Sequence, residues 1–149
     1  MGQRIDLASL APDFYTAMVG LEKAIHRSGI DPILYELIKI RASQINGCAY
    51  CLDMHLRDAR RGGEIQRRLD IVSAWREAPS FFSDAERAAL ALTEETTMIA
   101  ADGAPAVVWD AAVDALGEKG VAQVLMAVVA INGWNRMAVS THQDLPPDP

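Results

Sequence analysis

The sequence predicts an all-α protein, a single-domain helical bundle of about six or seven helices. Three observations support this fold class. Aromatic residues make up only 6% of the chain and Ala, Leu, Val and Ile are abundant, a composition that favours helix over sheet. Apolar residues recur at helical spacing between glycine and proline breaks, and no long segment alternates with period two. At 149 residues the chain has the length of one domain, so we expect residues 1–149 to form a single unit.

Glycine and proline separate the first four expected helices. The first covers residues 12–27 and ends at a Ser-Gly pair. Asp31 followed by proline is typical of an N-cap and a helix start, and this second helix extends to the Asn-Gly pair at 46–47. The third is expected over 48–61, before two glycines. The fourth is expected over 64–75, before an Ala-Pro-Ser sequence.

Three further helices are expected in the second half of the chain. Ser83 and Glu86 have the S-x-x-E spacing of a capping box, which predicts the start of a long helix that extends to about residue 101. A shorter helix follows over 105–116, and a last one over 120–139. Residues 144–149 contain three prolines, so we expect a loose tail there.

Charge and hydropathy exclude several classes of partner. Lys and Arg number 14 against 20 Asp and Glu, a net charge of −6, so the chain lacks the basic balance of a nucleic-acid-binding protein. The most apolar run, 121–131, is shorter than the roughly 20 residues of a membrane-spanning helix, and we expect no membrane partner. The N-terminal sequence lacks the apolar stretch of an export signal, so a cytoplasmic location is expected.

The chemistry-bearing segment is a C-x-x-C pair followed by a histidine. Cys48 and Cys51 are the two cysteines of the chain, and His55 follows Cys51 by four residues. On a helix that starts near Cys48, the three side chains share one face. The positive end of the helix and a nearby imidazole both favour a thiolate, and the second sulfur can trap an oxidised first sulfur as a disulfide.

Zinc binding is the main alternative for this segment. Cys48, Cys51 and His55 supply three ligands, and Glu36 or His142 could supply a fourth. However, the chain has no second C-x-x-C pair and no H-x-x-x-H pair, and structural zinc sites usually draw paired ligands from two segments. Because the sequence also carries no flavin or nicotinamide fingerprint, we expect neither a metal nor an organic cofactor.

A longer motif surrounds the cysteines. It runs from Glu36 through Lys-Ile-Arg-Ala-Ser-Gln at 39–44 and Asn-Gly-Cys-Ala-Tyr-Cys at 46–51 to His55 and the glycines at 62–63. This segment closely resembles the core motif of the alkylhydroperoxidase D-like proteins of the carboxymuconolactone decarboxylase superfamily. Ile-Asn-Gly-Trp-Asn-Arg at 131–136 is also similar to members of this family.

The resemblance implies an all-helical cysteine peroxidase that reduces hydroperoxides and assembles as a homo-oligomer, a trimer or hexamer, with a dimer as the alternative. By motif position, its catalytic residues are Glu36, Cys48, Cys51 and His55. The resemblance also implies an external dithiol reductant, either a lipoyl-bearing or a thioredoxin-like protein. One position differs: Tyr50 stands where the best-known members carry a second histidine, so any proton transfer by that histidine is in doubt here.

The chemistry expected of these residues begins at Cys51. His55, oriented by Glu36, accepts the Cys51 proton; the thiolate attacks the peroxide, and Cys48 condenses with the resulting sulfenic acid. The order of the two cysteines stays open, because Cys48 lies nearer the expected helix start. Two other functions also stay open: a decarboxylase-like activity, which in this superfamily does not depend on the cysteine pair, and a redox-sensing module that is oxidised without turnover.

Overall fold

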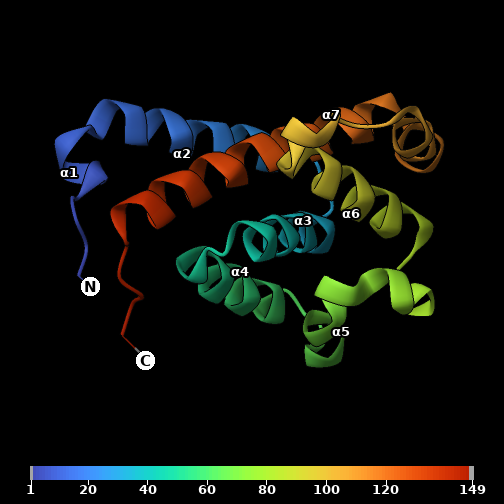
Figure 1. Cartoon of the computed structure of the whole chain (residues 1–149), viewed down its shortest axis with the longest axis horizontal. Helices are drawn as coiled ribbons and strands as arrows, with labels where there is room; N and C mark the ends of the chain where they lie inside the picture. The colour runs from blue at the N-terminus through green and yellow to red at the C-terminus, as the bar shows by residue number, and fades with distance from the viewer. Residues whose placement is uncertain (1, 148–149) are drawn as a thin grey trace.

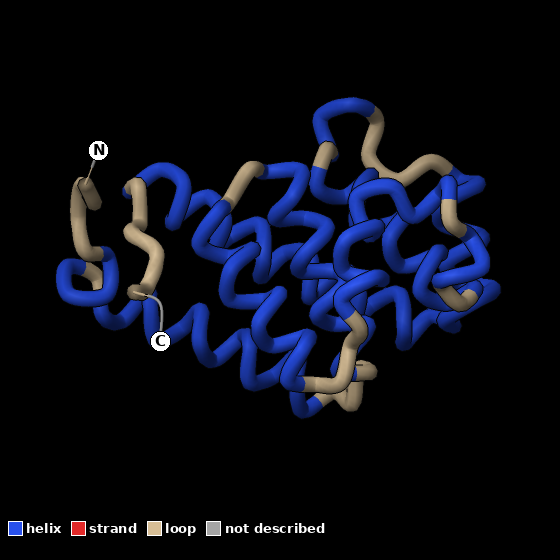
Figure 2. Tube along the Cα trace, turned by 90° about the horizontal axis from the view of Figure 1, so that it is seen from below, coloured by secondary structure: helices blue, strands red, loops and turns tan. Residues whose placement is uncertain are grey.

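The computed structural model describes residues 2–147, which fold into helices joined by short loops, without a strand in that range (Figures 1 and 2). The all-α prediction is therefore confirmed. The α-helices are α1 (Leu7–Leu10), α2 (Pro12–Arg27), α3 (Pro32–Asn46), α4 (Ala49–Arg61), α5 (Gln66–Ile71), α6 (Asp84–Thr97) and α7 (Ala106–Thr141). Short 3₁₀ helices cover Val72–Glu77, Pro79–Phe81 and Ile99–Ala101.

Helix ends follow the capping signals of the sequence. The Asp31 side chain accepts a hydrogen bond from the Leu34 N–H at 2.8 Å, directly before the proline that opens α3. At the other end of α3, Gly47 adopts φ 64°, a left-handed conformation that glycine reaches without steric cost. Both hydrogen bonds of the Ser83–Glu86 capping box are present at the start of α6.

The expected helix over 64–75 is wrong in part. The α-helix ends at Ile71, and the chain continues as a 3₁₀ segment in which Ala74 leaves helical geometry. This break brings the buried Trp75 indole to Glu94 of α6, with Nε1 donating at 2.9 Å. Trp75 and Glu94 are 19 residues apart in sequence, so helical periodicity in the 64–75 segment does not reveal their contact.

Two other boundaries also differ from expectation. The expected helix from Ser83 to about 101 ends as an α-helix at Thr97 and is followed by a 3₁₀ turn. The helices expected over 105–116 and 120–139 are the two halves of α7, separated by Gly117 with φ 68° and ψ 167°. Within residues 2–147, every helix is too short or too polar to span a lipid bilayer.

The ends of the chain also bear on the predictions. The short helix α1 was not expected; the Asp6 carboxylate caps it by accepting hydrogen bonds from two backbone N–H groups. Of the expected tail, residues 144–147 form no helix, and residues 148–149 lie outside the described residues.

The central helix is α3, which packs against α4, α6 and α7 (Figure 1). Leu37, Ile38, Ile40 and Ala42 of α3 are fully buried, so nearly every face of this helix is covered. Burial of each large aliphatic side chain contributes about 1.5–3 kcal/mol relative to exposure. The part of the motif over residues 36–44 therefore lies on the buried central helix.

The N-terminal segment and the end of α7 lie at the same end of the molecule (Figure 1). The Arg4 N–H donates to the Thr141 carbonyl at 2.7 Å, and the Arg4 guanidinium donates to the Ser140 carbonyl at 3.1 Å. These bonds hold residues 3–8 beside α2, α3, α4 and α7, where the five segments enclose a cavity.

Candidate active site

The two cysteines lie at the start of α4. Cys48 is the N-cap residue, with extended backbone angles, and Cys51 is in the first helical turn. Both are free thiols, and their exposed fractions are 1% and 2%. Gly47 makes this placement possible, because its left-handed conformation ends α3 and turns the chain directly into α4.

The two thiols differ sharply in acidity. Cys48 accepts hydrogen bonds from the Cys51 thiol, the Cys51 and Tyr50 backbone N–H groups and the Asn135 side chain. Burial raises the pKa of Cys48, but these hydrogen bonds outweigh burial and lower it to about 6. Three effects raise the pKa of Cys51 above its usual range: the hydrogen bond that its thiol donates to Cys48, burial, and repulsion by the Cys48 charge. The hydrogen bond between the thiols therefore favours a single negative charge on the reduced pair, with Cys48 the more acidic of the two sulfurs.

Asn135 of α7 is fixed beside the cysteines by two side-chain hydrogen bonds. Its Nδ2 donates to Ser43 Oγ at 3.0 Å, and its Oδ1 accepts from Asn46 Nδ2 at 2.9 Å. Asn135 is 1% exposed, and its amide lowers the pKa of both thiols. The end of α3 thus orients an amide donor of α7 towards the sulfur atoms.

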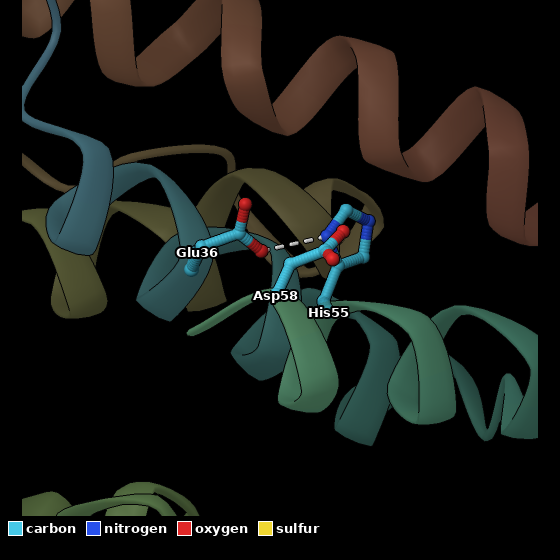
Figure 3. Close-up of side chains that lie close together, drawn as sticks. All are labelled: Glu36, His55 and Asp58. Carbon is cyan, nitrogen blue, oxygen red and sulfur yellow. Dashed lines mark hydrogen bonds and ion pairs between the residues drawn. The ribbon is translucent and has the colours of Figure 1, made fainter. Parts of the chain in front are cut away.

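Glu36 and His55 form a hydrogen-bonded pair across the α3–α4 contact. His55 Nδ1 lies 2.8 Å from Glu36 Oε2, and the exposed fractions of the two side chains are 7% and 14%. When Nδ1–H donates to the carboxylate, the other imidazole nitrogen is left as a proton acceptor. Figure 3 shows Asp58 of α4 beside this pair, with the three side chains directed towards one another.

A cavity of about 320 Å³ gives access to Cys51. Cys51, His55 and Glu36 all line it, whereas Cys48 does not. Part of its wall is aromatic: Tyr15 and Trp134 meet edge to face, with ring centroids 5.1 Å apart. The volume is at the lower end of the range for cavities that bind small organic molecules.

A second polar cluster lines the same cavity. Glu22 of α2 accepts hydrogen bonds from Lys39 Nζ, Tyr35 Oη and, at 2.8 Å, Trp134 Nε1. Burial opposes ionisation of Glu22, but these donors outweigh it, and the pKa of Glu22 is lowered. Lys39 is 1% exposed, and its ammonium lies 4.4 Å from the centroid of the Tyr35 ring.

The structure brings together a different set of possible metal ligands from the one that the zinc alternative requires. Among the described residues, the group whose ligand atoms lie within 4.8 Å of one another consists of Glu36, His55 and Asp58, and neither cysteine belongs to it. The thiol-based zinc site considered from the sequence is therefore not assembled.

Three of the four residues selected from the sequence meet at one surface. Glu36, Cys51 and His55 line the cavity, and Cys48 lies behind Cys51 at the helix start. Sequence reasoning missed Asp58, whose i,i+3 spacing from His55 could have revealed it. It also assigned no role to Lys39 or Asn135, although both lie within the motifs that carry the resemblance.

The chain matches one protein family and two bacterial relatives. The model of the carboxymuconolactone decarboxylase family matches residues 12–95. The uncharacterised protein YdfG of Bacillus subtilis is 37% identical over 140 residues, 94% of this chain and 95% of YdfG. The uncharacterised protein YnjA of Escherichia coli is 32% identical over 123 residues, 80% of this chain and 64% of YnjA.

Solved structures share the fold. A protein of unknown function from Agrobacterium tumefaciens, described as a candidate antioxidant defence protein AhpD, superposes with a TM-score of 0.93 at 35% identity, over 98% of this chain and 99% of that protein. The debrominase Bmp8 superposes with a TM-score of 0.82 at 21% identity, over 93% of this chain and 74% of Bmp8. The likeness to Bmp8 concerns the fold alone.

Proposed function

The chain belongs to the carboxymuconolactone decarboxylase family and is of the alkylhydroperoxidase D-like kind, and on that premise we propose that it is a thiol-dependent peroxidase. The observation that carries the proposal is the placement of the two cysteines. Cys51 lines a cavity together with the Glu36–His55 pair, and Cys48, whose pKa is lowered to about 6, lies outside the cavity lining. A reacting sulfur, a base and a resolving thiolate are thus available together.

In the proposed oxidation, Cys51 is the sulfur that attacks the peroxide. His55 accepts the Cys51 proton while Glu36 stabilises the imidazolium. The Cys51 sulfur then takes the terminal oxygen of the hydroperoxide, the O–O bond breaks, and His55 returns the proton to the leaving alkoxide. The products of this step are an alcohol and Cys51 sulfenic acid.

The second step forms the disulfide. The Cys48 thiolate attacks the sulfenic sulfur, and hydroxide leaves and takes one proton from solvent to become water. Both thiols have then been oxidised by two electrons in total, and the hydroperoxide has been reduced to alcohol and water. An external dithiol, lipoyl-bearing or thioredoxin-like, attacks the disulfide and leaves as its own disulfide.

The acidity of Cys48 also favours this reductive step. The cavity leads to Cys51, so the incoming thiolate meets the Cys51 sulfur first. Cys48 then departs as a thiolate stabilised by its hydrogen bonds, and a thiol of low pKa is a good leaving group. The difference in acidity between the two thiols thus favours both the formation of the disulfide and its reduction by the dithiol.

The assembly that we propose is a homo-oligomer, a trimer or hexamer, with a dimer as the alternative. Large apolar side chains at several surface positions are compatible with subunit contacts; examples are Ile99, Val107 and Val129, each more than half exposed.

The function is tested by continuous consumption of an organic hydroperoxide with a dithiol in excess. Lipoyl-type and thioredoxin-type donors are compared, and Cys48→Ser and Cys51→Ser variants serve as controls. A redox sensor would instead be oxidised once without turnover, and a decarboxylase-like enzyme would keep its activity in both variants.

A further inference from the structure

Lys39 is a buried cation within the cluster of Glu22, Tyr35 and Trp134. Its ammonium donates to Glu22, and its 1% exposure separates it almost completely from solvent. Removing two charges from water is costly, and a buried ion pair can often be replaced by apolar side chains without loss of stability. Stability alone is therefore a weak explanation for a lysine at this position.

The position of Lys39 suggests a chemical role. It follows Glu36 by three residues on α3, and both line the cavity that contains Cys51. Lys39 is the one Lys or Arg among the described lining residues; the other charged or titratable groups there, apart from tyrosines and Cys51 itself, are Asp6, Glu22, His26, Glu36, His55 and Asp58. The cavity is thus rich in carboxylates, and Lys39 shares its lining with Cys51.

The electrostatic interaction between Lys39 and Cys51 is direct. Burial leaves the pKa of Lys39 below its usual value, although the charges of Glu22, Glu36 and Cys51 oppose this and favour the ammonium. The ammonium in turn lowers the pKa of Cys51, against the larger effects of Cys48 and burial.

Proton loss from Cys51 is the costly event in the proposed reaction, because it creates a second negative sulfur beside Cys48. We propose that Lys39 is a positioning residue for this event: its buried ammonium, anchored by Glu22, stabilises the Cys51 thiolate. The timing of this role rests on the proposed peroxidase function. The interaction itself does not, so it can be measured without peroxide.

The test uses the full chain with Cys48→Ser, which leaves Cys51 as the single thiol. The rate of alkylation by iodoacetamide is followed against pH. Lys39→Met should move the midpoint of this profile upwards by about one pH unit, so that about tenfold less thiolate is present below the midpoint. Lys119→Met, which removes an exposed lysine outside the cavity, should leave the profile unchanged.

A second variant separates this role from a structural one. Lys39→Met leaves the Glu22 carboxylate without its cation, whereas Lys39→Met combined with Glu22→Gln removes both charges and keeps one acceptor oxygen for the donors at Tyr35 and Trp134. We expect the double variant to unfold at a higher denaturant concentration than Lys39→Met, yet to keep a raised midpoint. Lys39→Arg should restore the wild-type profile.

An unshifted midpoint in the folded double variant would overturn the role of Lys39. This result is distinct from failure of the proposed function. If the protein consumes no peroxide but the alkylation profile still shifts, the interaction between Lys39 and Cys51 stands and the peroxidase proposal fails. If peroxide is consumed and the profile does not shift, the opposite holds.

Discussion

Glu36 and His55 are joined by a 2.8 Å hydrogen bond between Oε2 and Nδ1, across the contact of α3 with α4. Neither side chain is more than 14% exposed, and both line the cavity that contains Cys51. This arrangement fixes the orientation of the imidazole ring. It therefore gives the proposed proton transfer a definite geometry and allows the contribution of each residue to be separated.

The first prediction concerns this pair. His55→Ala should slow the reaction of reduced protein with hydroperoxide by a factor on the order of 10²–10⁴, as expected for loss of a general base. Glu36→Gln should slow it less, because the carboxylate acts through the imidazole. The two effects should not add. A double-mutant cycle on the peroxide reaction rate, with Glu118→Gln as a surface control, measures the coupling, and full additivity would argue against the relay.

The second prediction concerns the two thiols. Reduced protein should show two well-separated thiolate titrations, one with a pKa of about 6 and one above the ordinary range of a free cysteine. We expect the lower step to come mainly from Cys48, so the resolving thiolate should be lost as the pH falls through 6. Ultraviolet thiolate absorbance against pH gives both steps. Two thiols that titrate together near 8.5 would contradict the asymmetry.

The third prediction concerns Glu94, a buried carboxylate that joins three segments. Burial opposes its ionisation, but hydrogen bonds from Arg76, Trp75 and Arg41 outweigh burial and lower the pKa of Glu94. Its contribution to stability is therefore present above the unfolded pKa of about 4.3 and is lost as the pH falls through the folded value. Glu94→Gln should lower the free energy of unfolding at pH 7 by about 1–3 kcal/mol.

Denaturant titrations of the wild type and Glu94→Gln at neutral and acid pH measure this effect. The difference in unfolding free energy should shrink as the pH falls through the lowered pKa of Glu94, since the wild-type carboxylate then becomes neutral as well. A difference that stays constant with pH would show that the charge of Glu94 is not the cause.

The fourth prediction concerns assembly. Light scattering at micromolar concentration should give a mass above that of the 16.2 kDa chain. Val129→Glu places a charge on an exposed apolar position of α7 and should lower the measured mass if that face is a subunit contact. A wild-type monomer at this concentration would contradict the expectation of a homo-oligomer.

Local signals in the sequence were sufficient for most of the fold. The Asp31 cap, the Ser83 capping box and the left-handed glycine at 47 act within a few residues, so their patterns are visible in the chain itself. The break after Ile71 was not predictable in this way. It brings Trp75 to Glu94, and this tertiary contact overrides the helical periodicity of the segment.

The candidate site likewise contains some residues that local sequence patterns reveal and others that they do not. Cys48, Cys51 and His55 are close in sequence, so helical spacing alone brings them together. The catalytic role of Glu36 came only from the family resemblance, because its apolar neighbours carry no local sign of the contact with His55. The cluster around Lys39 was missed, since Glu22 and Trp134 lie 17 residues before it and 95 residues after it on other helices.

The most direct test of the account is a single-turnover experiment on reduced protein with one equivalent of an organic hydroperoxide, followed by addition of a dithiol. We predict that both thiols disappear, that mass spectrometry finds an intramolecular Cys48–Cys51 disulfide, and that one equivalent of alcohol forms. The dithiol should then restore both thiols and permit a second turnover. Two alkylatable thiols that survive the peroxide, in protein that remains folded, would contradict the account.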